Sequence, residues 1–118
     1  MFEEFSRGYY LGRLYVEPYG GEHVAMRRDQ HERVNEQLYA TSDGIERLDA
    51  PLVMKVDGHH FAVHGEDGVP GDTLVLPDSV LDKTGIENPP ALTEVLLAKA
   101  DRAAQLLRIQ RGHPGVGV

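Results

Sequence analysis

The chain has 118 residues and a formal net charge of −7, with 12 Lys and Arg against 19 Asp and Glu. It contains no Cys, which excludes disulfides, thiol nucleophiles and Cys-ligated metal centres. An acidic surface repels nucleic-acid phosphates and anionic membranes unless a local basic patch compensates. The length predicts one domain over residues 1–111, with a flexible tail over 112–118. No apolar run approaches the length of a membrane span and the start does not resemble a signal peptide, so we expect a cytoplasmic protein.

The N-terminal part predicts a first β-hairpin over residues 9–28. YYLGRLYVEP alternates as a strand, with Tyr10, Leu14 and Val16 on the side expected to face the core. Pro18-Tyr19-Gly20-Gly21 is a turn signal, and a second strand follows over 22–28.

Residues 29–40, DQHERVNEQLYA, predict a surface helix. Asp29 and Glu32 have the spacing of a capping box, and the apolar stripe is thin. His31, Glu32 and Asn35 share a helix face, but HExxN lacks the second His of a zinc-hydrolase motif. We therefore assign them no catalytic role.

The central stretch predicts a second hairpin within residues 52–76. Asp57-Gly58 favours a type I′ turn, which pairs Leu52 with Val63 and Met54 with Phe61. In that register one face, which includes these four residues, is a core face. The other face, which carries Val53, Lys55, His60 and Ala62, is expected to be mixed and wet.

The histidines of the hairpin are candidate metal ligands. His60 and His64 project to the same side, but roughly 13 Å of extended strand separates them. A metal site at His60 and His64 would need a third group such as His23, His31 or a partner chain. The simpler interpretation is one His at the rim of the core and two at the surface, and we predict no cofactor. Lys55 opposite His60 should favour the neutral form of that imidazole.

The C-terminal part predicts a short strand over 73–76, a helical turn over 78–84 and a long amphipathic helix over 89–110. Leu92, Val95 and Leu96 begin its apolar stripe, which exceeds what a small sheet needs. We therefore expect a homodimer, with Leu97, Ala104 and Ile109 as candidate partner-surface residues. The predicted fold is α+β, a small antiparallel sheet of hairpins (9–28 and 52–76) with a surface helix (29–40) and this long helix.

The basic residues form one small candidate patch for nucleic acid, Arg13, Arg27, Arg28 and Arg33. Only Lys55, Lys83 and Lys99 are Lys, whereas nine residues are Arg. Few Lys and many acids fit a chain that stays hydrated in concentrated salt, and they also fit a GC-rich genome alone.

Short segments of the sequence resemble two known protein families. FSRGYYLGRLYVEP, HERVNEQLYA, ERLDAPLVMKVDG and HFAVHG resemble a family of small uncharacterised haloarchaeal proteins, which implies a salt-rich cytoplasm and no assigned activity. DTLVLP followed by DSV and Gly85-Ile86 looks like the strand–Pro–helix unit of swapped-hairpin regulators of the AbrB and SpoVT type. However, Asp78 and Asp82 stand where basic residues would help to contact DNA.

No Walker loop, GxGxxG, nucleophile elbow or HExxH is present. We therefore expect a non-catalytic binding or regulatory module that acts through protein–protein contacts. The alternatives are a nucleic-acid-binding regulator that uses the Arg patch, and a small enzyme or weak metal-binding protein that uses the His cluster.

Overall fold

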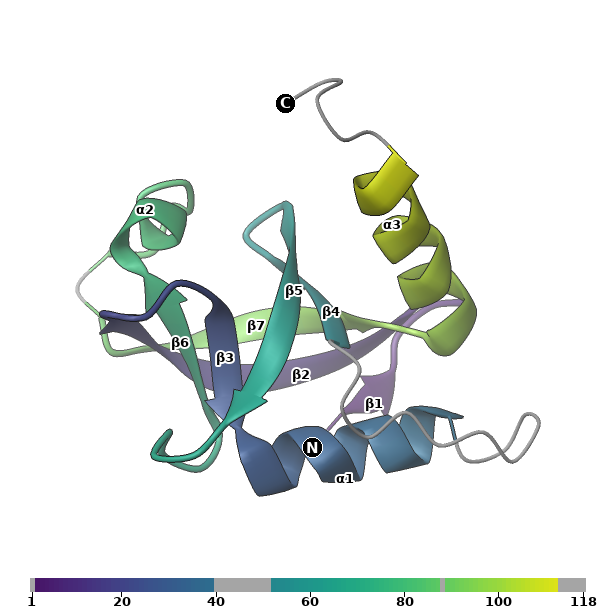
Figure 1. The fold of residues 1–118 in the computed structure, drawn as a ribbon, viewed down its shortest axis with the longest axis horizontal. Helices are drawn as coiled ribbons and strands as arrows, with labels where there is room; N and C mark the ends of the chain where they lie inside the picture. Colours follow the sequence, from purple (N-terminus) through teal and green to yellow (C-terminus); the bar gives the residue numbers. More distant parts are fainter. Residues whose placement is uncertain (1, 40–51, 88, 113–118) are drawn as a thin grey trace.

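The structure is a computed structural model that describes residues 2–39, 52–87 and 89–112. Seven strands form one sheet in the order β1-β2-β6-β3-β5-β4-β7, and β7 pairs back with β2. Six of these strands therefore close into a barrel, with β1 added beside β2 (Figure 1). In chain order the elements are β1 (Glu3–Glu4), β2 (Tyr9–Tyr19), β3 (Val24–Arg27), α1 (Arg28–Tyr39), β4 (Leu52–Val56), β5 (His59–Glu66), β6 (Thr73–Pro77), α2 (Asp78–Leu81), β7 (Ala91–Ala98) and α3 (Ala100–Gly112).

The predicted small antiparallel α+β sheet is wrong, because the sheet is mixed and closed. The strands at 9–19 and 24–27 form, but they do not pair with each other as the hairpin over 9–28 required. β6 lies between them, parallel to β2 and antiparallel to β3. β3 likewise lies between β5 and β6, parallel to β5, so the 52–76 stretch is not one continuous meander. Turn residues in the sequence indicate where the chain reverses direction, but they do not determine which strands pair, because pairing depends on packing between distant segments.

The central hairpin of β4 and β5 is confirmed, including its register. Leu52 pairs with Val63, Met54 with Phe61 and Val56 with His59. Asp57 and Gly58 have φ values of 47° and 83°, as a type I′ turn requires. The second face differs from the prediction at Val53, which is completely buried because α3 covers this part of the barrel wall.

The long helix predicted over 89–110 is also wrong. Its first half is strand β7, and only α3 is helical. β7 pairs along its length with β2 and on its other side with β4, and this double pairing closes the barrel. In β7, Val95 and Leu97 point inward and are buried, whereas Leu92 and Glu94 are exposed, so the side chains alternate with a period of two. The predicted tail over 112–118 lies outside the described residues except for Gly112.

The barrel interior is filled by aliphatic side chains rather than open. Twelve fully or almost fully buried barrel residues pack together there: Leu14, Val16, Val24, Met26, Leu52, Met54, Val56, Val63, Leu74, Leu76, Val95 and Leu97. Val34 and Leu38 of α1 join this core, as do Val80 and Leu81 of α2. Figure 1 shows α1 and α2 on opposite sides of the barrel. With the interior occupied by apolar groups, the side chains that can bind or react lie on the outside.

α1 confirms the helix predicted over 29–40 within one residue at its start. α3 packs on the outer wall through Ala103, which is buried against Val53 and Ala98. The outer wall is therefore covered by α3 over one part and left open over another.

Candidate functional site

The uncovered outer wall of β2 and β7 carries an apolar strip. Phe5, Tyr15 and Leu92 are exposed large apolar side chains, with 59%, 49% and 57% of their surface accessible. Tyr15 is the register partner of Leu92, and Leu11 is the partner of Leu96, four residues away along each strand. Alternation along a strand puts these residues on one face. We call Phe5, Leu11, Tyr15, Leu92 and Leu96 the outer strip.

An ion pair lies in the middle of the outer strip. Arg13 pairs in register with Glu94, and Arg13 Nη2 is 3.5 Å from Glu94 Oε2. The two side chains are 66% and 64% exposed, so this contact contributes little to stability and both charges are accessible to another molecule.

The surface on either side of the strip is hollowed. One depression of about 290 Å³ is lined by Phe5, Leu11 and Leu96, with Lys55 and Glu94 at its rim. Another of about 580 Å³ is lined by Leu11 and Arg13 beside Glu3 and Asp72. Apolar side chains between shallow depressions are typical of a surface that receives another macromolecule.

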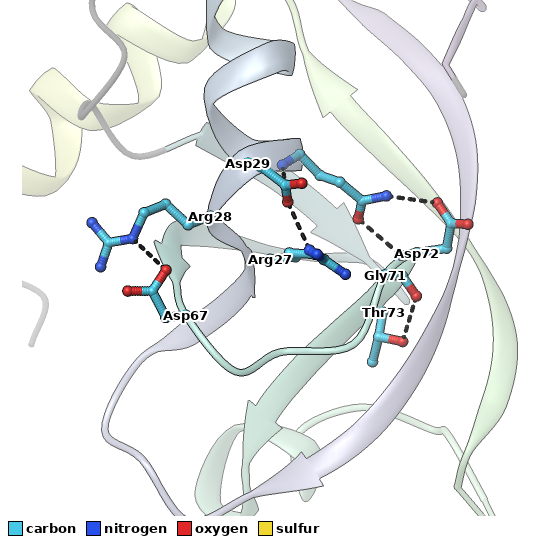
Figure 2. Close-up of polar contacts among 8 residues, drawn as sticks. Arg27, Arg28, Asp29, Asp67, Gly71, Asp72 and Thr73 are labelled. Atoms are coloured by element: carbon cyan, nitrogen blue, oxygen red, sulfur yellow. Dashed lines mark hydrogen bonds and ion pairs between the residues drawn. The ribbon is translucent and has the colours of Figure 1, made fainter.

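A separate open pocket of about 550 Å³ lies where β3 meets α1. Figure 2 shows that its two arginines are held by carboxylates. Arg27 Nε is 2.8 Å from Asp29 Oδ1, and Arg28 Nε is 3.0 Å from Asp67 Oδ1. With Glu32 also in its wall, the ionisable side chains that line this pocket sum to one net negative charge.

Gln30 of α1 fixes the loop beside this pocket. Its Nε2 donates to Asp72 Oδ1 at 3.2 Å, and its Oε1 accepts from the Asp72 backbone N–H at 2.8 Å. Thr73 Oγ1 in turn donates to the Gly71 carbonyl at 3.0 Å (Figure 2). The polar groups around the pocket are therefore largely engaged with one another.

The four arginines predicted for nucleic acid do not form one free basic patch. Arg13 lies on β2 in an ion pair, while Arg27 and Arg28 lie at the β3–α1 junction and are also paired. Arg33 is exposed on α1. Each paired guanidinium would have to release a carboxylate before it could neutralise a phosphate, which disfavours binding to nucleic acid. Nucleic-acid binding stays a prediction.

The two histidines proposed as metal ligands occupy different surroundings. His60 Nε2 is hydrogen bonded to Tyr9 Oη at 2.7 Å. Burial lowers the pKa of His60, and the charges of Lys55 and Arg102 lower it further. This agrees with the expected effect of Lys55. The ring of His64 instead contacts the ring of His23, with centroids 4.8 Å apart.

The candidate partner surface on the predicted long helix is partly wrong. Leu97 lies in β7 and is only 2% exposed, because it belongs to the barrel core. Ala104 and Ile109 are exposed on α3. The outer strip was not predicted from the sequence, although Leu11 and Tyr15 alternate with the core residues of the predicted strand. Leu92 and Leu96 were assigned to the apolar stripe of a helix, so their position on the outer face of a strand could not be foreseen.

Residues 1–113 match a family of unknown function, DUF5802, and the chain belongs to this family. No curated protein and no solved structure matches the chain. No helix within the described ranges is long and apolar enough to cross a membrane.

Proposed function

We propose that this protein is a non-catalytic binding module that associates with a second copy of itself through the outer strip. The observation that carries the proposal is the exposed apolar face of β2 and β7 beside the part of the barrel wall that α3 covers. Large apolar side chains gathered on one exposed face favour a protein contact over a role in stability.

The pattern on this face is self-complementary. Consider a two-fold axis that lies in the plane of the contact and runs along the seam between β2 and β7. It places β2 of one copy over β7 of the other, and each residue over the register partner of its own equivalent. Leu11 then faces Leu96, and Tyr15 faces Leu92. Arg13 faces Glu94 of the other copy twice, so that apolar groups meet apolar groups and opposite charges meet.

The size of the face favours a weak dimer. A stable interface buries about 800 Å² on each partner, and the outer strip supplies the apolar centre of such an area rather than all of it. We therefore expect dissociation constants in the micromolar range, about −8 kcal/mol. The Arg13–Glu94 contacts would set orientation more than affinity.

We place this association in a salt-rich cytoplasm, an inference supported by the excess of 19 acidic over 12 basic residues and by the scarcity of Lys. Two copies that each carry a net charge of −7 repel one another at low ionic strength. Concentrated salt screens this repulsion and strengthens contacts between apolar groups. The dimer should accordingly become more stable as KCl rises.

Sedimentation equilibrium in 0.1 M and in roughly 2 M KCl tests the proposal, since the Debye length falls from about 10 Å to under 3 Å over this range. We expect the wild type to dimerise, more tightly at the higher salt. Arg13→Glu and Glu94→Arg should each weaken self-association at least about tenfold, about 1.4 kcal/mol, because like charges then face each other twice.

Charge reversal gives an internal control. An equimolar mixture of the Arg13→Glu and Glu94→Arg chains should form a heterodimer, because both facing pairs again have opposite charges. Ile109→Gln, at an exposed apolar residue on α3 that lies outside the strip, should leave self-association unchanged. A monomeric wild type at both salt concentrations would overturn the proposal, as would single variants that dimerise as well as the wild type.

A further inference from the structure

Two histidines that are far apart in the sequence meet on the outside of the barrel. His23 directly precedes β3, and His64 lies in β5, which runs parallel to β3 with Ala25 as the register partner of His64. The ring centroids are 4.8 Å apart, and the ring planes are tilted by 40°. The fold thus brings together two imidazoles that the sequence separates by a strand, a helix and a hairpin.

The spacing of these rings matches that of two imidazoles on one metal ion. An imidazole nitrogen binds a first-row ion at about 2.0–2.1 Å, so with the ring centre behind its nitrogen, two rings at about 90–110° have centres roughly 4.5–5.2 Å apart. The observed 4.8 Å falls inside this interval. Two rings already held at this distance by adjacent strands need not be brought together when an ion binds, which lowers the ordering cost of binding.

The strand that carries His64 also carries a carboxylate close to that ring. Glu66, two residues beyond His64 on the same strand, accepts a hydrogen bond from Tyr19 Oη at 2.8 Å. Its carboxylate adds a negative charge near the pair, which favours a cation there.

We propose that His23 and His64 form an open, two-histidine site for a divalent first-row transition ion. Among the described residues no group of three or more His, Cys, Asp or Glu side chains is placed to hold a metal. The site therefore has two protein ligands, and water or a ligand from a bound molecule completes the coordination. An all-nitrogen pair selects Ni²⁺, Cu²⁺ and Zn²⁺ over Mg²⁺ and Ca²⁺, which require oxygen ligands.

This site differs from the one that the sequence suggested. His60 is engaged with Tyr9 and does not take part. An ion on His23 and His64 would tie the connection between β2 and β3 to strand β5. Since the pair is assembled only in the folded chain, metal binding should also raise the melting temperature.

Isothermal titration of the untagged full chain with NiCl₂ and with ZnCl₂ tests the proposal. We expect one ion to bind per chain, with the dissociation constant raised at least about tenfold by either His23→Ala or His64→Ala. His23 is exposed, so its replacement leaves the barrel intact. His59→Ala serves as the matched control, because His59 is also an exposed histidine of this sheet but is bonded to the Asp57 carbonyl at the hairpin turn. The His59→Ala variant should bind Ni²⁺ and Zn²⁺ with the same affinity as the wild type.

A second readout is the melting temperature with and without ZnCl₂. Zinc should raise it for the wild type and for His59→Ala, and should leave it unchanged for the double variant His23→Ala, His64→Ala. Equal Ni²⁺ affinity in the wild type and the double variant would overturn the proposal. So would Mg²⁺ binding as tight as Ni²⁺ binding, because oxygen ligands would then be responsible.

Discussion

His31 is a polar residue that the fold buries with specific partners. It is 2% exposed, and its Nε2 donates to the Val63 carbonyl at 2.8 Å, which leaves Nδ1 to accept from Asn35 Nδ2 at 3.2 Å. The i, i+4 spacing that we noted in the sequence therefore supports a structural contact between α1 and β5. Gly65 makes room for the ring, because a Cβ there would lie 3.0 Å from His31 Cβ.

Replacement of His31 by Phe should lower the free energy of unfolding by about 1–3 kcal/mol. Phe has a similar ring but cannot donate to the Val63 carbonyl, and it takes away the acceptor of the Asn35 amide. Urea denaturation measures the change. His59→Phe is the control, since His59 is exposed and its replacement should cost less than about 0.5 kcal/mol. Equal losses in the two variants would contradict a structural role for the His31 bonds.

For single helices and strands, the sequence predicted the features that depend on neighbouring residues in the chain. The β4–β5 register followed from Asp57-Gly58 alone, because a two-residue turn fixes which residues face each other. The β7 strand was missed because ALTEVLLAKADRAAQLL also satisfies a helical period, and a short apolar run does not distinguish the two. Pairing with both β2 and β4 decides for the strand, and neither partner is adjacent in sequence.

The turn of the central hairpin gives a prediction with a matched glycine control. Gly58→Ala should destabilise the protein by about 1–2 kcal/mol, because the residue has a φ of 83° that an L-side chain adopts only with strain. Gly20→Ala should be nearly neutral, since the added Cβ meets no atom within 4 Å and its φ is not left-handed. Thermal melts of both variants compare the two positions. A loss at Gly20 as large as at Gly58 would show that glycine content rather than turn geometry matters.

The docking of α3 on the barrel wall gives a second prediction at this scale. Ala103→Asp should destabilise the protein by at least about 2 kcal/mol, because Ala103 is fully buried against Val53 and Ala98 and a carboxylate there loses its hydration. Ala104→Asp changes the same residue type in the same helix at an exposed position. It should cost only the difference in helix propensity, up to about 0.7 kcal/mol. Similar denaturation midpoints for the two variants would argue that α3 does not depend on this contact.

At the scale of the whole molecule, closure of the barrel creates the candidate surface. Residues 11–15 and 92–96 are distant in sequence, and they become neighbours only because β7 returns to β2. A prediction based on hairpins pairs each strand with the strand next to it in sequence, so it could not place Leu92 beside Tyr15. The exposed alternation of β2 was nevertheless visible, since Leu11 and Tyr15 occupy odd-numbered positions and the core residues Leu14 and Val16 occupy even-numbered ones. The meeting of His23 and His64 depends on the parallel β3–β5 pair and was equally beyond local rules.

The charge of the whole chain predicts how its stability depends on salt. With a net charge of −7, carboxylates spread over a small barrel repel one another, and KCl should raise the melting temperature as the Debye length shrinks from about 10 Å at 0.1 M to about 3 Å at 1 M.

The triple variant Glu22→Gln, Glu36→Gln, Glu87→Gln removes three exposed carboxylates, which changes the net charge from −7 to −4. It should melt higher than the wild type in low salt and gain less from added KCl. Differential scanning calorimetry on both proteins at several KCl concentrations measures this. Equal gains would mean that salt acts through exclusion from apolar surface rather than through screening of charge, because only the screening contribution depends on the number of carboxylates.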